Sequence, residues 1–346
     1  MTAPASLLIV HQGALGDLVC IFPIIAALRS HFRPVAILCQ GQLGRLAAAE
    51  QLVDAWFAIE AAWAASLFTA DPAPEARRAL APYTHHLVLS KSAILAASLE
   101  RIAGARIGRF APRPPAGRRR HVAEHVLSGL RGLGWLPEGP ADAILAPPPS
   151  AGARPGGPGA KTVLLHPGAG SPRKRWPLAG FLDLAARIEA RRLSPEFVIG
   201  PAEHDLLAEL ERRSAVVHRP ADGIELLGRL RSAAAYIGND SGASHLAGWA
   251  GRPSVVIFGP TDPARWRPLG RAVEIVRLPL TCTPCFETAA ANCPGAECLG
   301  DIAADGVMEA LERALRRVAA GVAPEGNPSF GGGGGSRSHA DGPASR

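Results

Sequence analysis

The stretch AYIGNDSGASHLAGWAGRPSVVIF, residues 235–258, contains one complete strand–helix–strand unit. Its two ends, Ala235–Gly238 and Ser254–Phe258, are short apolar runs without alternation, as expected of strands that are buried on both faces of a sheet. The segment between them, Ala243–Ala250, has the length and composition of a helix. Strands joined through one helix run parallel, because the crossover returns the chain to the end where the first strand began. The unit therefore predicts a parallel α/β sheet.

The same alternation repeats along most of the chain. Further expected strands are Leu7–Val10, Val35–Leu38, Thr162–His166, Phe197–Gly200, Val216–His218 and Val273–Leu278, and further expected helices are Asp17–Ser30, Leu43–Glu50, Leu178–Arg192, Ala202–Arg213, Ile224–Ala233 and Ala304–Ala320. Residues 146–160, APPPSAGARPGGPGA, lack both periodicity and core residues and predict a linker. We therefore expect two Rossmann-like domains, residues 1–145 and 161–321, whose parallel sheets face each other across a cleft. Residues 322–346 form a Gly/Ser-rich tail that we expect to be disordered.

Length and composition limit the classes of protein to consider. The chain has 346 residues, about twice the usual size of one domain, and 47% are hydrophobic, which excludes a mainly disordered protein. The net charge of +7 suits acidic ligands, although aromatic residues make up only 5%, too few for a nucleic-acid stacking surface. No secretory signal is visible, Leu18–Leu28 is too short to span a bilayer, and six cysteines are too few for a disulfide scaffold. We therefore expect a cytoplasmic protein.

Three loops follow expected strands at the edge of the sheet where ligands bind in this architecture. The first, HQGALGD, runs from His11 to Asp17. Gly13 and Gly16 permit a tight turn and a close approach to a ligand. Asp17 begins the next helix, and taken by itself it is better explained as a helix N-cap.

The second loop, HPGAGSPRKRWP, runs from His166 to Pro177 and combines glycines, a serine and three basic residues. Backbone N–H groups, the Ser171 hydroxyl and positive charge suit a pyrophosphate. Lys174 is one of only three lysines in a chain with 34 arginines, so it is the strongest candidate phosphate ligand. For Arg173 and Arg175, an exposed basic loop is an equal explanation.

The third loop, GNDSGASH, runs from Gly238 to His245. Its small residues expose the N-terminal amides of the following helix to an anion. Taken singly, Asp240 is also explained as a helix cap and His245 as an ordinary buried histidine. Two such loops in one domain nevertheless indicate a site for a phosphorylated ligand.

Signatures of other enzyme classes are incomplete. The Gly168-x-Gly170 pair reaches Arg173 where a dinucleotide fingerprint requires glycine, which disfavours an NAD-dependent oxidoreductase. The chain contains no GxxxxGK[ST], HExxH or GxSxG motif, so a P-loop enzyme, a zinc protease and a serine hydrolase are not indicated.

Four cysteines gather near the C-terminal part of the second domain. They are Cys282, Cys285, Cys293 and Cys298. Four thiolates within seventeen residues would suffice for a structural zinc site, but the spacing departs from the usual paired CxxC pattern. Thiols or reversible disulfides are the alternatives, and no catalytic metal is expected.

Taken together and in this order, the three loops resemble those of glycosyltransferase family 9, the ADP-heptose:lipopolysaccharide heptosyltransferases. The matching segments are GALGDLVCIFPIIAALR, HPGAGSPRKRWP and GNDSGASHLAGWAGRPSVVIFGPTDPARW, and the cysteine segment is also similar to the family's C-terminal part. The resemblance extends from about Leu7 to Arg317. It implies a GT-B fold, with an acceptor bound mostly by the first domain and a nucleotide-sugar donor bound by the second.

The resemblance also implies roles for individual residues. Asp17 is expected to be the catalytic base, and Lys174 to bind the donor phosphates and stabilise the charge that develops on the leaving group. Glu203 is expected to bind the nucleoside, with a helix N-terminal charge as an equal explanation. The other expected donor ligands are Gly16, Ser171, Asp240, Ser241, Gly242 and His245.

The expected function is inverting, metal-independent transfer of a heptose or similar sugar from an ADP-sugar to a lipopolysaccharide core or related surface glycan. A lipid-linked acceptor implies peripheral contact with the cytoplasmic face of the inner membrane. The stretch Arg101–Arg131 holds eight arginines and one acid, Glu124, which suits a phosphorylated acceptor but also an ordinary solvated face. Alternatives are a family member with another donor and a non-catalytic nucleotide-sugar-binding protein. Asp17 argues against the second, because donor binding alone requires no acid across the cleft.

Overall fold

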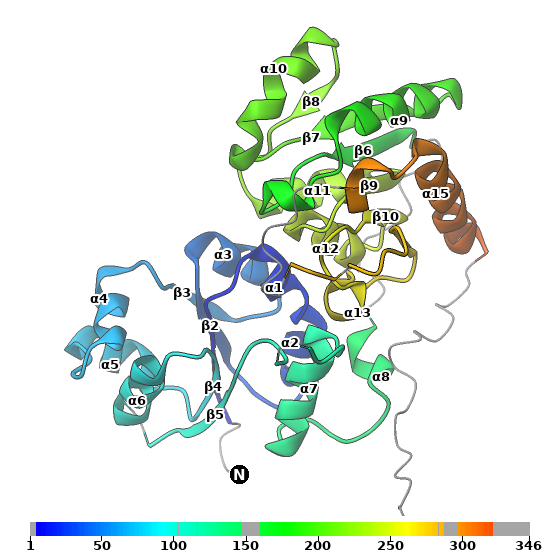
Figure 1. The fold of residues 1–346 in the computed structure, drawn as a ribbon. Helices are drawn as coiled ribbons and strands as arrows, with labels where there is room; N and C mark the ends of the chain where they lie inside the picture. Colours follow the sequence, from blue (N-terminus) through cyan, green and yellow to red (C-terminus); the bar gives the residue numbers. More distant parts are fainter. Residues whose placement is uncertain are drawn as a thin grey trace, which may run out of the picture.

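The protein consists of two parallel α/β sheets joined in one chain (Figure 1). The computed structural model describes residues 5–102, 104–115, 117–146, 160–282, 284–286 and 297–320. The strand order is β3-β2-β1-β4-β5 in the first sheet and β11-β10-β9-β6-β7-β8 in the second. Every strand pair is parallel. The α/β class with two parallel sheets is confirmed.

The first sheet is built around β1, whose five residues are all buried. Its strands are β1 (Leu7–His11), β2 (Val35–Cys39), β3 (Ala55–Ala58), β4 (His85–Leu89) and β5 (Arg106–Phe110). Its helices are α1 (Leu15–Val19), α2 (Phe22–Leu28), α3 (Gly41–Ala49), α4 (Ala62–Ala65), η1 (Ser66–Phe68), α5 (Pro74–Leu80), α6 (Ala93–Ile102), α7 (Val122–Gly132) and α8 (Asp142–Leu145). Helices on both faces explain why β2 is apolar throughout and why β1 is apolar up to its last residue, His11.

The second sheet has β6 and β9 at its centre. Its strands are β6 (Thr162–His166), β7 (Ser194–Val198), β8 (Val217–His218), β9 (Ala235–Asn239), β10 (Ser254–Ile257) and β11 (Val273–Val276). Its helices are η2 (Pro172–Lys174), α9 (Leu178–Ala190), η3 (Pro201–Glu203), α10 (His204–Arg212), α11 (Gly223–Ser232), α12 (Gly242–Trp249), α13 (Pro263–Trp266), α14 (Glu297–Gly300) and α15 (Ala304–Ala319). The strand–helix–strand unit of residues 235–258 is β9–α12–β10.

The prediction of one continuous helix after β1 was wrong. Asp17–Ser30 was expected to be continuous, but the structure divides it into α1 and α2. Pro23 explains the break, because its ring lacks an N–H and would clash with the carbonyl of Val19 in a continuous helix. The separate α1 places Asp17 in the first turn of a short helix.

Other predicted boundaries shifted, and some elements were missed. β7 begins three residues before the predicted Phe197–Gly200, and Ala202–Arg213 begins as the 3-10 turn η3 before α10. The missed elements are β3, β4 and β5, helices α4 to α8, α13 and α14, and the 3-10 turns η1 and η2.

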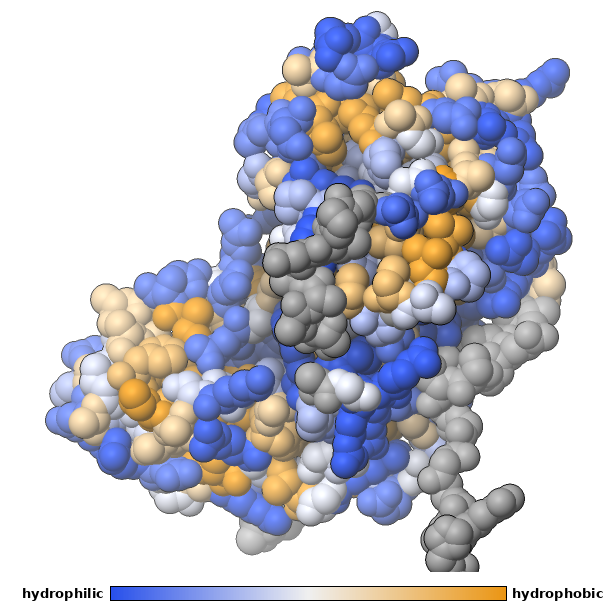
Figure 2. All heavy atoms as spheres, in the orientation of Figure 1, coloured by the Kyte–Doolittle hydropathy of each residue, from blue (hydrophilic) through white to orange (hydrophobic). Residues whose placement is uncertain are grey.

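The two domains share a hydrophobic core. Side chains of α2 in the first domain and α12 in the second belong to one buried cluster, in which the Phe22 and Trp249 rings meet edge to face at 5.2 Å. Helices α1 and α12 are the main point of contact between the domains and lie side by side at the centre of Figure 1. Figure 2 shows hydrophilic side chains gathered along the junction of the two lobes.

Parts of the predicted domain organisation lie outside the described residues. Of the expected linker 146–160, the structure describes only the two end residues, and it describes none of the expected tail 322–346. The domain boundaries therefore remain predictions. Within the described ranges, no helix is both long enough and apolar enough to cross a membrane.

Candidate active site

A cavity of about 280 Å³ lies between the two sheets. It is formed where the chain leaves β1, β6, β9 and β10, at the carboxyl ends of parallel strands. Its volume is close to the lower limit of ligand pockets, ~300 Å³. The lining residues are Ala14, Gly16, Asp17 and Arg113 from the first domain and Gly170, Lys174, Asp240, Ser241, Gly242, His245, Thr261, Trp266 and Phe286 from the second.

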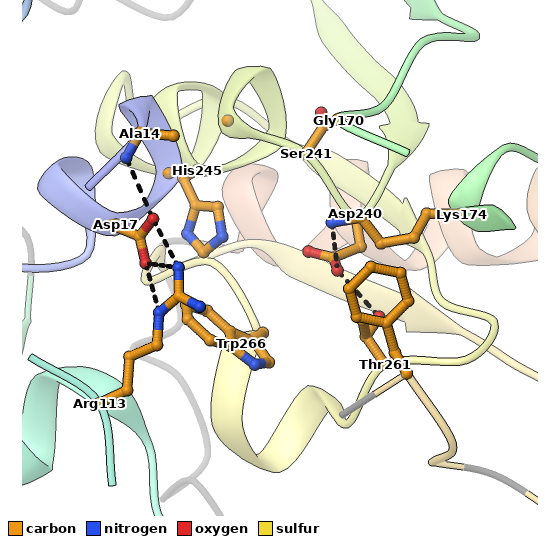
Figure 3. Close-up of a pocket in the computed structure, with 13 residues that line it drawn as sticks. Ala14, Asp17, Arg113, Gly170, Lys174, Asp240, Ser241, His245, Thr261 and Trp266 are labelled. Atoms are coloured by element: carbon orange, nitrogen blue, oxygen red, sulfur yellow. Dashed lines mark hydrogen bonds and ion pairs between the residues drawn. The ribbon is translucent and has the colours of Figure 1, made fainter. Parts of the chain in front are cut away.

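Asp17 is paired with an arginine, Arg113, that was not among the predicted site residues. Arg113 donates to Asp17 Oδ1 from Nε at 3.1 Å and from Nη2 at 2.8 Å, and Nη2 also lies 3.0 Å from Oδ2 (Figure 3). Oδ2 in addition accepts the backbone N–H of Ala14 at 3.2 Å. The N-cap of α1 is Ala14, so Asp17 is not the N-cap residue that its alternative explanation predicted. It lies at the third position of the helix, accepts the N–H of the N-cap residue and also lines the cavity.

Arg113 spans the two domains. Its guanidinium lies 4.9 Å from the centre of the Trp266 ring, a distance typical of a cation–π contact. The side chain is 50% exposed, whereas that of Asp17 is 13% exposed. The arginine therefore covers the acid at the solvent side of the cavity.

The segment that carries Arg113 is fixed to the second domain. Arg265, which is buried, donates to the backbone carbonyls of Pro114, Pro115 and Arg118. Arg119 Nε donates to Asp262 Oδ2 at 3.0 Å. These contacts hold a basic segment of the first domain over α13.

Lys174 lies at the end of η2 and points toward the loop after β9. Its Nζ is 3.2 Å from Asp240 Oδ2, and the same oxygen accepts the Thr261 hydroxyl at 2.8 Å (Figure 3). The Lys174 side chain is 17% exposed and that of Asp240 is 7% exposed. Asp240 therefore orients the lysine and does not cap α12, one of the roles considered for it.

The N-termini of α1 and α12 meet at two glycines. A Cβ added to Gly242 would lie 3.0 Å from Leu15 Cβ and 3.1 Å from the backbone nitrogen of Gly16. A side chain at either glycine would separate the helices. Because neither glycine has a side chain, the N-termini of both helices reach the same cavity. Each helix N-terminus is a favourable environment for an anion.

A buried asparagine supports the phosphate-type loop. Asn239 Nδ2 donates to the carbonyls of Pro167 at 2.8 Å and Gly168 at 3.2 Å, and its Oδ1 accepts the N–H of Trp176 at 2.9 Å. Trp176 is 2% exposed and packs on Phe181, so it anchors the loop to the second domain. The loop after β6 is thus positioned from the end of β9.

Buried histidines surround the cavity floor. Burial lowers the pKa of His11 and of His166 to about 4 in each case, so both are neutral near pH 7. Burial also lowers the pKa of His245, although the carboxylates of Asp240 and Asp17 oppose the shift. The positive charge in the site therefore comes from Lys174 and Arg113.

Most of the predicted site residues lie in the cavity, and two do not. Gly16, Asp17, Lys174 and the four predicted residues of the loop after β9 line it, whereas Ser171 and Glu203 do not. Glu203 is buried, accepts the N–H of Gly200 at 2.8 Å and lies 3.7 Å from Arg175. These contacts agree with its alternative explanation as an acid at a helix N-terminus.

The cysteine cluster is only partly within the described residues. Cys293 lies outside them, Cys285 is buried and Cys282 is exposed. Among the side chains that the structure describes, no three His, Cys, Asp or Glu residues are arranged to hold a metal. Structural zinc at Cys282, Cys285, Cys293 and Cys298 therefore remains a prediction.

Five residues of the site were not predicted from sequence. They are Arg113, Asn239, Thr261, Trp266 and Phe286. Asn239, Thr261 and Trp266 lie within the third matching segment. Arg113 lies within the basic stretch Arg101–Arg131. The sequence therefore indicated the segments but not these four residues. Their partners are distant in sequence, and no local pattern identifies them.

Residues 145–294 match the model of Glycosyltransferase family 9 (heptosyltransferase). The chain is 28% identical over 169 residues to Lipooligosaccharide heptosyltransferase 2 of Campylobacter jejuni, a match that covers 46% of this chain and 52% of that protein. It is 31% identical over 157 residues to Lipopolysaccharide heptosyltransferase 1 of Pseudomonas aeruginosa, covering 44% of this chain and 43% of that protein. The chain thus spans about half the length of the curated relatives it matches.

The fold is similar over nearly the whole chain to a solved structure. The E. coli heptosyltransferase WaaC with ADP superposes with a TM-score of 0.65 and covers 89% of this chain and 99% of that one. At 17% sequence identity this likeness shows the fold alone. It identifies the two-sheet architecture as GT-B, as the sequence predicted.

Proposed function

Because residues 145–294 match the model of glycosyltransferase family 9, we propose that this chain is an inverting glycosyltransferase. It moves a heptose, or a similar sugar, from an ADP-sugar to a lipopolysaccharide core or related surface glycan. The observation that carries the proposal is that Asp17 of the first domain and Lys174 of the second line the same cavity. The first domain binds mainly the acceptor and the second mainly the donor.

The proposed reaction proceeds in one displacement. The acceptor hydroxyl oxygen attacks the anomeric carbon from the face opposite the phosphate, and the bond between that carbon and the phosphate oxygen breaks. The electron pair of the broken bond leaves with ADP. The hydroxyl proton passes to the carboxylate of Asp17, which acts as general base. Attack from the opposite face inverts the anomeric configuration.

Lys174 and the N-terminus of α12 stabilise the negative charge that develops on the leaving ADP. The ammonium has three N–H donors, of which one faces Asp240 and two are suited to phosphate oxygens. The Ser241–Gly242 turn presents backbone amides to the same cavity. This preorganised positive potential supplies the electrostatic stabilisation, so the proposed reaction requires no metal.

Arg113 defines the resting state of the proposed base. A carboxylate offers about four acceptor positions. In Asp17, three contacts from Arg113 and one from Ala14 occupy them. An acceptor hydroxyl can therefore reach Asp17 only after Arg113 withdraws from at least one oxygen. Half of the arginine side chain is already in water, so this withdrawal costs little.

ADP is the first nucleotide to test, because the solved relative WaaC contains it. The test measures thermal stabilisation by ADP, ADP-heptose, UDP, GDP and NAD. A ligand at ~100 times its Kd stabilises the fold by about 2.7 kcal/mol. Selective stabilisation by ADP and ADP-heptose is expected. A response to UDP or GDP instead would assign another donor, and stabilisation by NAD alone would contradict the proposal.

A transfer assay separates catalysis from simple binding. The protein is incubated with ADP-heptose and a lipopolysaccharide-core acceptor that lacks the heptose, and the acceptor mass is followed. Gain of one heptose per acceptor, with release of ADP, is the expected result. Tight ADP-heptose binding without any gain would favour a non-catalytic nucleotide-sugar-binding protein.

We extend the proposal to location and partners. A lipid-linked acceptor is presented at the cytoplasmic face of the inner membrane, so we place the protein in the cytoplasm with peripheral contact at that face. Its partners are then the nucleotide sugar and the glycan acceptor, with no nucleic acid. Co-sedimentation with anionic vesicles at low and high salt tests the membrane contact, which should weaken as salt rises.

A further inference from the structure

A buried thiol contacts the histidine at the floor of the cavity. Cys20 ends α1 in the first domain, and His245 lies in α12 of the second. Cys20 Sγ is 3.3 Å from His245 Nδ1. Cys20 is 1% exposed and His245 is 4% exposed, so water does not compete for this contact.

The protonation states of the pair fix the direction of the hydrogen bond. Burial raises the pKa of the Cys20 thiol well above its usual value, and the carboxylate of Asp17 raises it further. Burial lowers the pKa of His245. A neutral thiol therefore meets a neutral imidazole. An imidazole nitrogen is a good acceptor and a thiol sulfur is a weak one, so the S–H donates to Nδ1 and the ring hydrogen is on Nε2.

The other side of the ring belongs to the cavity. A Cβ added to Gly16 would lie 3.1 Å from His245 Cδ2 and 3.6 Å from Nε2. Figure 3 shows the His245 ring beside Asp17 and Arg113. Nε2 is therefore on the side of the ring that faces the α1 N-terminus, where the proposed base and the donor meet.

We propose that Cys20 is a positioning residue that fixes His245 as the neutral tautomer with hydrogen on Nε2. His245 then presents one N–H donor of constant direction to an oxygen of the bound nucleotide sugar. The inference rests on the proposed function for the identity of that ligand. The tautomer itself depends only on the contact between the two side chains.

Two substitutions separate hydrogen bonding from packing. Cys20→Ser keeps a donor at the same position, and Cys20→Val keeps an apolar side chain but removes the donor. Loss of one such hydrogen bond corresponds to about a fivefold decrease in kcat/KM for the nucleotide sugar in the valine variant. The serine variant should recover most of this loss.

The pH profile supplies a readout that packing alone would not change. The charged and titratable groups that face His245 are Asp17 of α1, Asp240 after β9, Lys174 of η2, His121 before α7 and Arg113 after β5, whose guanidinium lies beside the ring in Figure 3. All of them are present in both variants. Without the thiol hydrogen bond, Nδ1 accepts a proton more easily, so the acidic limb of kcat/KM should move to higher pH in Cys20→Val and not in Cys20→Ser.

The tautomer can be observed without any transfer activity. Long-range 1H–15N spectra of protein labelled with 15N-histidine show which ring nitrogen carries the hydrogen, and His245→Gln assigns the signal among the 11 histidines. Hydrogen on Nε2 in the original protein and a mixture of tautomers in Cys20→Val are expected. Hydrogen on Nδ1 in the original protein would overturn the inference. So would a valine variant with unchanged spectrum and pH profile, or a serine variant as impaired as valine.

The two proposals fail in distinguishable ways. If no sugar is transferred while the spectra show the expected tautomer, the positioning role stands and the enzymatic function is contradicted. If transfer occurs but the tautomer is the other one, only the role of Cys20 is lost.

Discussion

Replacement of Asp17 by asparagine tests the proposed base with little change in shape. Asparagine keeps an oxygen that can accept the Ala14 N–H, now 3.2 Å from the carboxylate, but it cannot take up a proton from the acceptor. Loss of a general base lowers kcat by about 10²–10⁴-fold. The lost ion pair with Arg113 contributes about 1 kcal/mol or less to stability, because half of the arginine is exposed.

Asp262 provides a matched control. Like Asp17, it accepts a backbone N–H at a helix N-terminus, from Ala264 at 3.0 Å, and pairs with an arginine of the first domain, Arg119, at 3.0 Å. It is not among the residues that line the cavity. Asp262→Asn should therefore lose similar stability and retain transfer within a few-fold.

The assay measures heptose transfer to the acceptor, ADP affinity and melting temperature for both variants. Asp17→Asn should bind ADP as the original protein does and melt within a few degrees of it, while transfer falls by at least a hundredfold. Two results would refute the reasoning: transfer by Asp17→Asn within tenfold of the original, or an equal loss of transfer in both variants.

Three further predictions concern the donor side and the buried histidines. Lys174→Met should weaken ADP binding and lower kcat, whereas Arg173→Met, next to it but outside the cavity lining, should change neither; equal effects in titration calorimetry would return Lys174 to a surface role. Asn239→Asp places a carboxylate oxygen against two backbone carbonyls of the 167–176 loop. The groups left without a hydrogen-bond partner should lower the free energy of unfolding by about 1–3 kcal/mol, so both the melting temperature and the ADP affinity should fall. An unchanged Kd for ADP would contradict this role of Asn239. Burial lowers the pKa of four histidines from 6.5 to about 4 in the folded protein, so between these pH values the unfolded chain binds more protons than the folded one. The free energy of unfolding should therefore be highest above pH 6.5. It should fall toward pH 4 by about 1.4 kcal/mol per pH unit for each histidine. Equal urea unfolding free energies at pH 7 and pH 5 would exclude this last effect, which rests on four histidines: His11, His86, His121 and His166.

The elements that sequence predicted best are those with a local physical signal. The β9–α12–β10 unit was expected within one residue of its observed bounds, because strands buried on both faces must be apolar throughout. β4 begins with two histidines and β5 is RIGRF, so neither has such a run. β5 pairs only with β4 at the edge of its sheet, where polar side chains are tolerated.

The same distinction applies to the site. Sequence placed Asp17, Lys174 and the loop after β9 at the ends of parallel strands, which the topology of such sheets brings to one edge. It did not identify Arg113 as the partner of Asp17, because the two residues are 96 positions apart. The role of Glu203 as a nucleoside ligand stays a prediction, and its contacts with Gly200 and Arg175 agree with the equal alternative of an acid at a helix N-terminus.

Sequence by itself determined the alternation of strands and helices, the loops rich in glycine, and the rare lysine among arginines. These features depend on residues close together in the chain. Only the tertiary structure decided that Arg113 forms an ion pair with the proposed base Asp17. The same is true of the contact by which Asp240 orients Lys174 and of the contact between Cys20 and His245. Such contacts join different strands or different domains, and they arise from how the two sheets pack together, which no short stretch of sequence encodes.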